Sequence, residues 1–182
     1  MTTEALKSTA ITNLDATSSP FIVSRATTGE GAEGQLRHVQ GVLLVSASMG
    51  AGSTYRLVRL PSNAKVKSVI WESEAMGAGK FNVSVYYSDN PLDATAANLG
   101  VIVPTTGDQF FASDIDCAAA VARGSITNES GNYTLAKRNK ALWDALAIAS
   151  DPGGYLDLVA VIHTTDVTTG AARIGVEVEY VM

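Results

Sequence analysis

The sequence is poor in the residues that build covalent cross-links and metal centres. Its 182 residues include one cysteine, Cys117, and two histidines, His38 and His163. A single cysteine can neither form an internal disulfide nor supply a thiolate metal site. A chain of this length buries roughly 70% of its extended surface on folding, so it can be stable without either. We therefore expect a protein without metal or other cofactor.

Charge and long apolar runs are scarce as well. Only 17% of the residues are charged, and the net charge is −5. A negative net charge argues against non-specific binding to nucleic acid phosphates. No apolar run approaches the ~20 residues needed to span a bilayer. Residues 1–20 lack the basic start and apolar core of a signal peptide. These features predict a protein that folds in a cytoplasm and binds neither nucleic acid nor a membrane.

Short segments of alternating polarity dominate the rest of the chain. In residues 80–89, Phe81, Val83 and Val85 face one way, and Asn82 and Ser84 face the other. Similar alternation recurs in residues 54–60, 65–74 and 172–182, whereas residues 155–163 are apolar on both faces, as in a central strand. Such runs between turn-rich breaks are typical of antiparallel strands.

The pattern predicts an all-β fold, an antiparallel β-sandwich or jelly roll of about eight strands. One short helix is expected within residues 135–150, where Leu142 and Leu146 lie four apart and a Pro and two Gly follow. Trp143 is expected to pin this helix against the sheet. The predicted core consists of Phe81, Val83, Val85, Tyr87, Leu142, Leu146, Val159 and Val161.

The most patterned stretch, residues 53–75, carries four basic residues. Arg56, Arg59, Lys65 and Lys67 flank a break at residues 61–64, where Pro61 cannot donate a ladder hydrogen bond. The break therefore predicts a turn that links two adjacent strands. No glycine-rich loop or helix start lies beside the basic residues, so we interpret them as solvated or partner-facing rather than phosphate-binding.

Candidate catalytic residues are few. Glu72 and Glu74 form one acidic pair on a strand face, and Asp114 and Asp116 form another. Paired acids can flank a glycosidic bond or hold Ca²⁺, although exposed strands often carry such pairs as solvated positions. His163 ends an apolar strand, without a nucleophile or ligand pattern beside it.

Cys117 precedes an alanine-rich run and is interpreted as a small buried hydrophobic residue. Neither this residue nor either histidine belongs to a recognisable catalytic set, so we expect no enzymatic activity.

Residues 1–37 differ from the remainder and divide the chain into an N-terminal arm (1–37) and a sandwich domain (38–182). The arm is rich in Ser, Thr, Ala and Gly and cannot bury enough apolar surface to offset its own chain entropy. It is either a disordered tail or an extended arm that orders against a partner. The apolar triplet Phe21, Ile22 and Val23 has no use in a solvating tail, so we predict that it binds another chain.

Two segments carry a resemblance to a known family. "STYRLVRLPSNAKVKSVIWESEAMGAGKFNVSVYYSD" and "KALWDALAIASDPGGYLDLVAVI" resemble small virion proteins of tailed bacteriophages, over about residues 40–165. The resemblance implies a capsid decoration, or cement, protein that is made in the host cytoplasm and binds the exterior of the head. Its partner would be the major capsid protein, and it would act as a dimer or trimer.

Two alternatives stay open. The first is a tail, neck or fibre component with a glycan-binding face, for which Tyr86, Tyr133 and Tyr155 would have to form an exposed aromatic platform. The second is a sandwich-fold glycan hydrolase, for which the two acidic pairs would have to converge in a cleft.

Overall fold

The structure of the protein is a computed structural model. It describes residues 5–7, 35–91, 98–103, 107–164, 166–168 and 171–182. Among these residues, no helix is long and apolar enough to cross a membrane.

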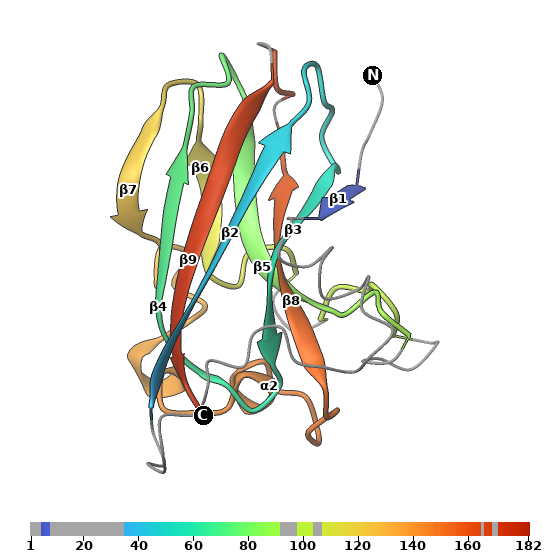
Figure 1. Ribbon diagram of the computed structural model, residues 1–182, viewed down its shortest axis with the longest axis vertical. Helices are drawn as coiled ribbons and strands as arrows, with labels where there is room; N and C mark the ends of the chain where they lie inside the picture. Colours follow the sequence, from blue (N-terminus) through green and yellow to red (C-terminus); the bar gives the residue numbers. More distant parts are fainter. Residues whose placement is uncertain (1–4, 8–34, 92–97, 104–106, 165, 169–170) are drawn as a thin grey trace.

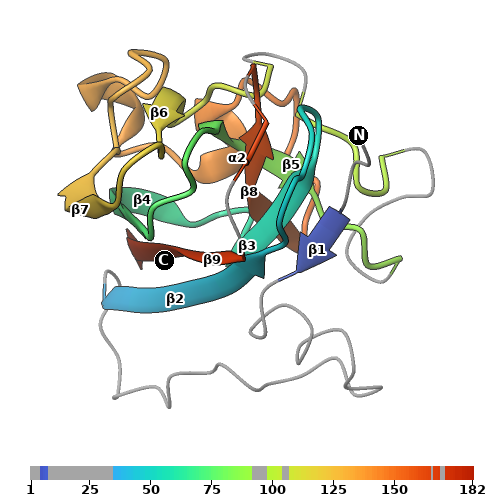
Figure 2. The ribbon, with the colours of Figure 1, turned by 90° about the horizontal axis from the view of Figure 1, so that it is seen from above.

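Two β-sheets face each other as layers (Figures 1 and 2). The first sheet, in spatial order, consists of β1 (Ala5–Lys7), β3 (Thr54–Pro61), β8 (Tyr155–Ile162), β5 (Lys80–Tyr87) and β6 (Ala112–Asp116). The second consists of β2 (Leu36–Val45), β9 (Ala172–Val181), β4 (Lys65–Ser73) and β7 (Val121–Ser125). Apart from β1, every paired strand is antiparallel. The predicted all-β sandwich is confirmed.

The core lies between the two sheets. Trp71 of β4 packs on Phe81 of β5 with ring centroids 5.8 Å apart, and Tyr55 of β3 lies 6.0 Å from the same ring. Strand β8 is buried on both faces between β3 and β5, as its sequence predicts. Of the predicted core, these residues are buried: Phe81, Val83, Val85, Leu142, Leu146, Val159 and Val161. Tyr87 is only partly buried, so its expected burial is wrong; Trp143, the residue expected to pin the helix, is partly buried as well.

The predicted turn at residues 61–64 is present, but the expectation that it links two adjacent strands is wrong. The amide of Ala64 donates to the carbonyl of Pro61 at 3.0 Å, as in a tight turn. Strand β3 before it belongs to the first sheet, and β4 after it belongs to the second. The turn therefore carries the chain from one layer of the sandwich to the other.

The predicted helix is shorter than expected. Residues 135–150 form a 3-10 turn (Leu135–Lys137) and the four-residue helix α2 (Leu142–Ala145). The amides of Leu142 and Trp143 donate to the carbonyls of Ala64 and Ser62, so the start of α2 is attached to the turn between β3 and β4. Ala147 then has a φ of 58°, which a continuing helix does not allow.

A strand within the expected arm is an addition to the prediction. Strand β1 pairs in parallel with β3, with Leu6 opposite Tyr55 (Figure 2). Strand β2 begins at Leu36, two residues before the expected domain. The division into arm and domain otherwise stays a prediction, because most of residues 1–37 lie outside the described residues.

Candidate functional site

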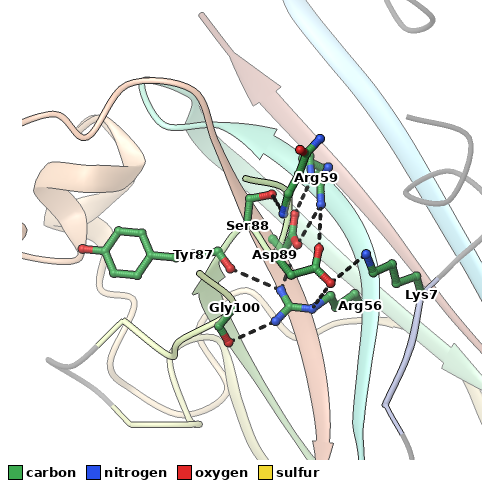
Figure 3. A network of polar contacts seen from close by, with 9 residues as sticks. Lys7, Arg56, Arg59, Tyr87, Ser88, Asp89 and Gly100 are labelled. Atoms are coloured by element: carbon green, nitrogen blue, oxygen red, sulfur yellow. Dashed lines mark hydrogen bonds and ion pairs between the residues drawn. The ribbon is translucent and has the colours of Figure 1, made fainter. Parts of the chain in front are cut away.

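Five charged side chains gather on the first sheet, between its edge strand β1 and its central strand β8 (Figure 3). Lys7 comes from β1, Arg56 and Arg59 from β3, Asp157 from β8, and Asp89 from the segment after β5. These residues are far apart in the sequence and meet because β3 lies between β1 and β8 in the sheet.

A bulge in β3 brings the two arginines together. Arg56 lies opposite Val159 and Val58 lies opposite Leu158, so one extra residue, Leu57, is accommodated between them. In a regular strand, residues 56 and 59 point to opposite faces. The extra residue reverses the alternation, and both guanidinium groups reach Asp157.

Asp157 is fully buried and accepts from both arginines. Arg59 donates from Nε to Oδ1 at 2.7 Å and from Nη2 to Oδ2 at 3.1 Å, and Arg56 donates from Nη1 to Oδ2 at 2.9 Å. The Arg59–Asp157 pair is thus bidentate, the geometry that gives strong charge-assisted hydrogen bonds. Burying a carboxylate without such partners is very costly, so the arginines are what allow Asp157 to lie there.

Asp89 links this buried pair to the N-terminal strand. Its carboxylate lies 2.7 Å from Lys7 Nζ, 3.2 Å from Arg59 Nη2 and 3.4 Å from Arg56 Nε. Arg56 also donates to the carbonyl oxygens of Tyr87 and Gly100. The network therefore links β1, β3, β8 and the segment after β5. Each of its five charged side chains is paired with an opposite charge within the same chain.

This arrangement corrects the interpretation of the basic residues in residues 53–75. Arg56 and Arg59 are neither solvated nor partner-facing, because their side chains are 11% and 3% exposed and bind acids of the same chain. Lys67 donates to the carbonyl of Arg138 and to Asn139 Oδ1, while Lys65 is exposed. Residues 53–75 have a structural role, as their sequence suggests. Two of their basic residues fulfil that role by forming ion pairs, which the sequence does not predict.

The two acidic pairs lie on different sheets and do not converge. Glu72 and Glu74 lie at the end of β4 in the second sheet, whereas Asp114 and Asp116 belong to β6 in the first. Asp114 Oδ1 lies 3.0 Å from His163 Nδ1. The described residues contain no group of three or more His, Cys, Asp or Glu side chains placed to hold a metal ion.

Asp116 is used locally, since its Oδ1 accepts from the amide of Ala118 at 2.9 Å. Cys117 is buried beside Ser73, whose hydroxyl lies 3.3 Å from its sulfur. Burial raises the pKa of the Cys117 thiol, which disfavours the reactive thiolate. His38 is exposed on β2 and lies 3.6 Å from Glu177.

The three tyrosines proposed for a glycan platform do not share a surface. Tyr133 is buried, and its hydroxyl donates to the carbonyl of Val66 at 2.6 Å. Tyr86 is partly buried beneath the guanidinium of Arg56, and burial raises its pKa to about 12. Tyr155 alone is exposed. An aromatic platform built from these three residues is therefore excluded.

Phe21, Ile22 and Val23, the predicted partner-binding residues, lie outside the described residues. The described surface offers another apolar feature that the sequence analysis missed. Leu36, Val42 and Leu44 point outward from β2 and are 61%, 42% and 50% exposed. The run "VLLV" at residues 42–45 resembles a buried strand, so only the structure, in which Leu43 and Val45 face the core and Val42 and Leu44 face outward, reveals this face.

Comparison with known proteins gives little further information. No protein-family model and no curated protein matches the chain. Among solved structures, "Cyanophage Pam1 capsid asymmetric unit" matches 92% of this chain and 98% of that chain, at 15% sequence identity and a TM-score of 0.42. A likeness at this identity and TM-score is too weak to support an inference about function.

Proposed function

We propose that this protein is a capsid decoration, or cement, protein of a tailed bacteriophage. It binds the outer surface of the head through the major capsid protein and stabilises the shell by bridging neighbouring subunits. The structural observation that carries the proposal is the pair of neighbouring outward residues Val42 and Leu44 on β2; Leu36 lies on the same face, beyond the exposed His38 and Gln40. Exposed apolar side chains that adjoin one another on one face can mark a protein–protein interface.

The sequence resemblance indicates the partner, and the fold suits the task. Among the described residues, the outer face of β2 is exposed and available for contact, and the ion-pair network in the first sheet fixes β1 to the sandwich. The function needs contact area rather than turnover, and we propose that the protein is not an enzyme. Many copies around one shell gain from avidity, so each contact can be modest.

The test uses phage heads and complete tailed particles, both prepared without this protein. Purified protein is added, the particles are sedimented, and bound copies are counted while the temperature of DNA release is recorded. We expect saturable binding of many copies over the shell and a higher release temperature. Binding of only a few copies, confined to the tail or neck, would favour the tail-component alternative. Failure of both heads and tails to bind the protein would refute a virion role.

The absence of turnover is tested separately. The purified protein is incubated with glycan, ester and peptide substrates, and we expect no hydrolysis. Activity that is lost on replacing Glu72, Glu74, Asp114 or Asp116 would overturn the proposal in favour of an enzyme.

A further inference from the structure

A hollow lies on the outer face of the second sheet, and its shape follows from the strand register. Val42 of β2 and Glu72 of β4 both lie opposite Gly175 of β9. Gly175 has no side chain, and the Glu72 side chain lies over it: a Cβ on Gly175 would be 3.1 Å from Glu72 Cγ and Oε1. An apolar residue, Val42, therefore lies on one side of the hollow and an acid on the other. Leu44 and Arg173 form the next pair on the same face, two residues along the strands. The hollow has a volume of about 340 Å³ and is open to solvent.

The hollow is lined by two acids, Glu72 and Glu74, and by two arginines, Arg123 and Arg173. Each arginine is paired with an acid. Glu74 accepts from the amide of Arg173 at 2.7 Å and lies 3.2 Å from its guanidinium, and Glu177 is paired with Arg123. The hydrogen bond from the Arg173 amide lowers the pKa of Glu74, and that from Arg123 lowers the pKa of Glu177. Both acids therefore stay ionised and neutralise the two arginines.

Glu72 is the acid that remains. It is exposed, and no described residue donates a hydrogen bond to it; the guanidinium of Arg123 acts on it only as a nearby charge. With the Glu74–Arg173 and Glu177–Arg123 pairs neutralised, the hollow presents one carboxylate beside the apolar side chain of Val42. This combination complements a basic side chain, whose aliphatic stem packs on apolar surface while its charged end meets an acid.

We propose that the hollow over Gly175 receives an arginine or lysine side chain of the capsid subunit, with its stem against Val42 and its charge at Glu72. This inference rests on the proposed function and adds which face of the sandwich docks and what chemistry the partner offers. An acidic segment is disfavoured, because it would place like charges against Glu72.

Two substitutions probe the hollow in different ways. Glu72→Gln removes the charge and keeps the size. Gly175→Val fills the floor; the first added atom would lie 3.1 Å from Glu72 Cγ and Oε1, atoms of a flexible side chain that can move. The matched control for charge is Asp144→Asn, which also removes one exposed acid, but from α2.

The assay measures binding to heads that lack the protein, with the urea-unfolding midpoint of each variant as a check on folding. Because removing one partner of a desolvated interfacial charge pair is costly, we expect Glu72→Gln to weaken binding about tenfold or more. Gly175→Val should weaken it similarly, and Asp144→Asn should bind like the wild type.

Three outcomes separate the possibilities. If the wild type binds heads and both hollow variants bind equally well, the inference is wrong and the proposed function stands. If Glu72→Gln instead dissociates an oligomer of this chain while head binding is kept, the occupant is a second copy and the capsid assignment fails. If the wild type does not bind heads, the proposed function itself has failed.

Discussion

Replacing Asp157 by Asn probes the interaction on which the first sheet most depends. The carboxylate is 0% exposed and accepts three hydrogen bonds from Arg56 and Arg59. The amide has nearly the same shape, but it removes the negative charge and turns an NH₂ group toward a guanidinium. Two nearly buried arginines would then share Asp89 as their remaining acid.

The expected loss follows from burial. Breaking a buried ion pair by removing one partner costs about 3–5 kcal/mol, because the other charge stays buried without compensation. For a chain of this size, each kcal/mol lowers the melting temperature by roughly 2–4 °C, so Asp157→Asn should lower it by roughly 6–20 °C. Asp89 is 24% exposed and partly screened by solvent, so Asp89→Asn should cost only about 1 kcal/mol.

Equilibrium unfolding in urea, followed by the fluorescence of Trp71 and Trp143, measures these differences directly. Asp144→Asn serves as the control, since Asp144 forms an exposed pair with Lys140 and should change stability by less than about 0.5 kcal/mol. A loss below about 1 kcal/mol for Asp157→Asn, or a larger loss for Asp89→Asn, would refute the idea that the buried carboxylate holds the network.

Three further predictions concern packing and pH. Trp71→Ala should cost about 3–5 kcal/mol of unfolding free energy because Trp71 is fully buried, whereas the partly buried Trp143 should cost clearly less; equal losses would contradict this account. Gly41→Ala should cost about 1–3 kcal/mol, because its Cβ would overlap the carbonyl oxygen of Leu57; an unchanged urea midpoint would show that β2 and β3 can separate at no cost. Hydrogen bonding from Arg123 lowers the pKa of Glu177 from 4.5, so the folded state binds this proton more weakly than the unfolded state. Its stabilisation is present above about pH 4.5 and is lost as the pH falls through the lower folded pKa; Glu177→Gln should flatten this part of the melting profile, and an unchanged profile would exclude the effect.

The sequence predicts the fold class well, because alternation reports which face of a strand is buried. Ile174, Val176 and Val178 of β9 face the core, as their spacing indicates. The apolar run of β8 marks a central strand for the same reason. Both predictions depend only on local periodicity, and periodicity survives wherever a strand is regular.

Prediction fails where a bulge shifts the register. In β4 the pairing shifts between Val66 and Ser68, so Val66 is buried on the same face as Val69 and Trp71, against strict alternation. The bulge in β3 similarly places Arg56 and Arg59 on one face. A bulge is stabilised by contacts from other strands, here Asp157 for the two arginines, and nothing within the strand itself encodes those contacts.

The same reasoning explains two failures of the sequence-based prediction. The sequence does not predict the exposed apolar face of β2, and it predicts that the buried arginines are exposed. Charged residues in a sequence usually predict exposure to solvent. Arg56 and Arg59 are instead largely buried, because both form ion pairs with Asp157 of β8. Apolar residues suggest a core, yet Val42 and Leu44 turn outward because β2 is an outer strand whose inner face is filled by Leu43 and Val45. An apolar residue can be buried either in the core of its own chain or against a partner, and its hydrophobicity does not distinguish the two cases. If a partner covers Val42 and Leu44, as we propose, the interface residues lie within a run whose sequence resembles a core strand, and only the order of strands in the sheet distinguishes the two.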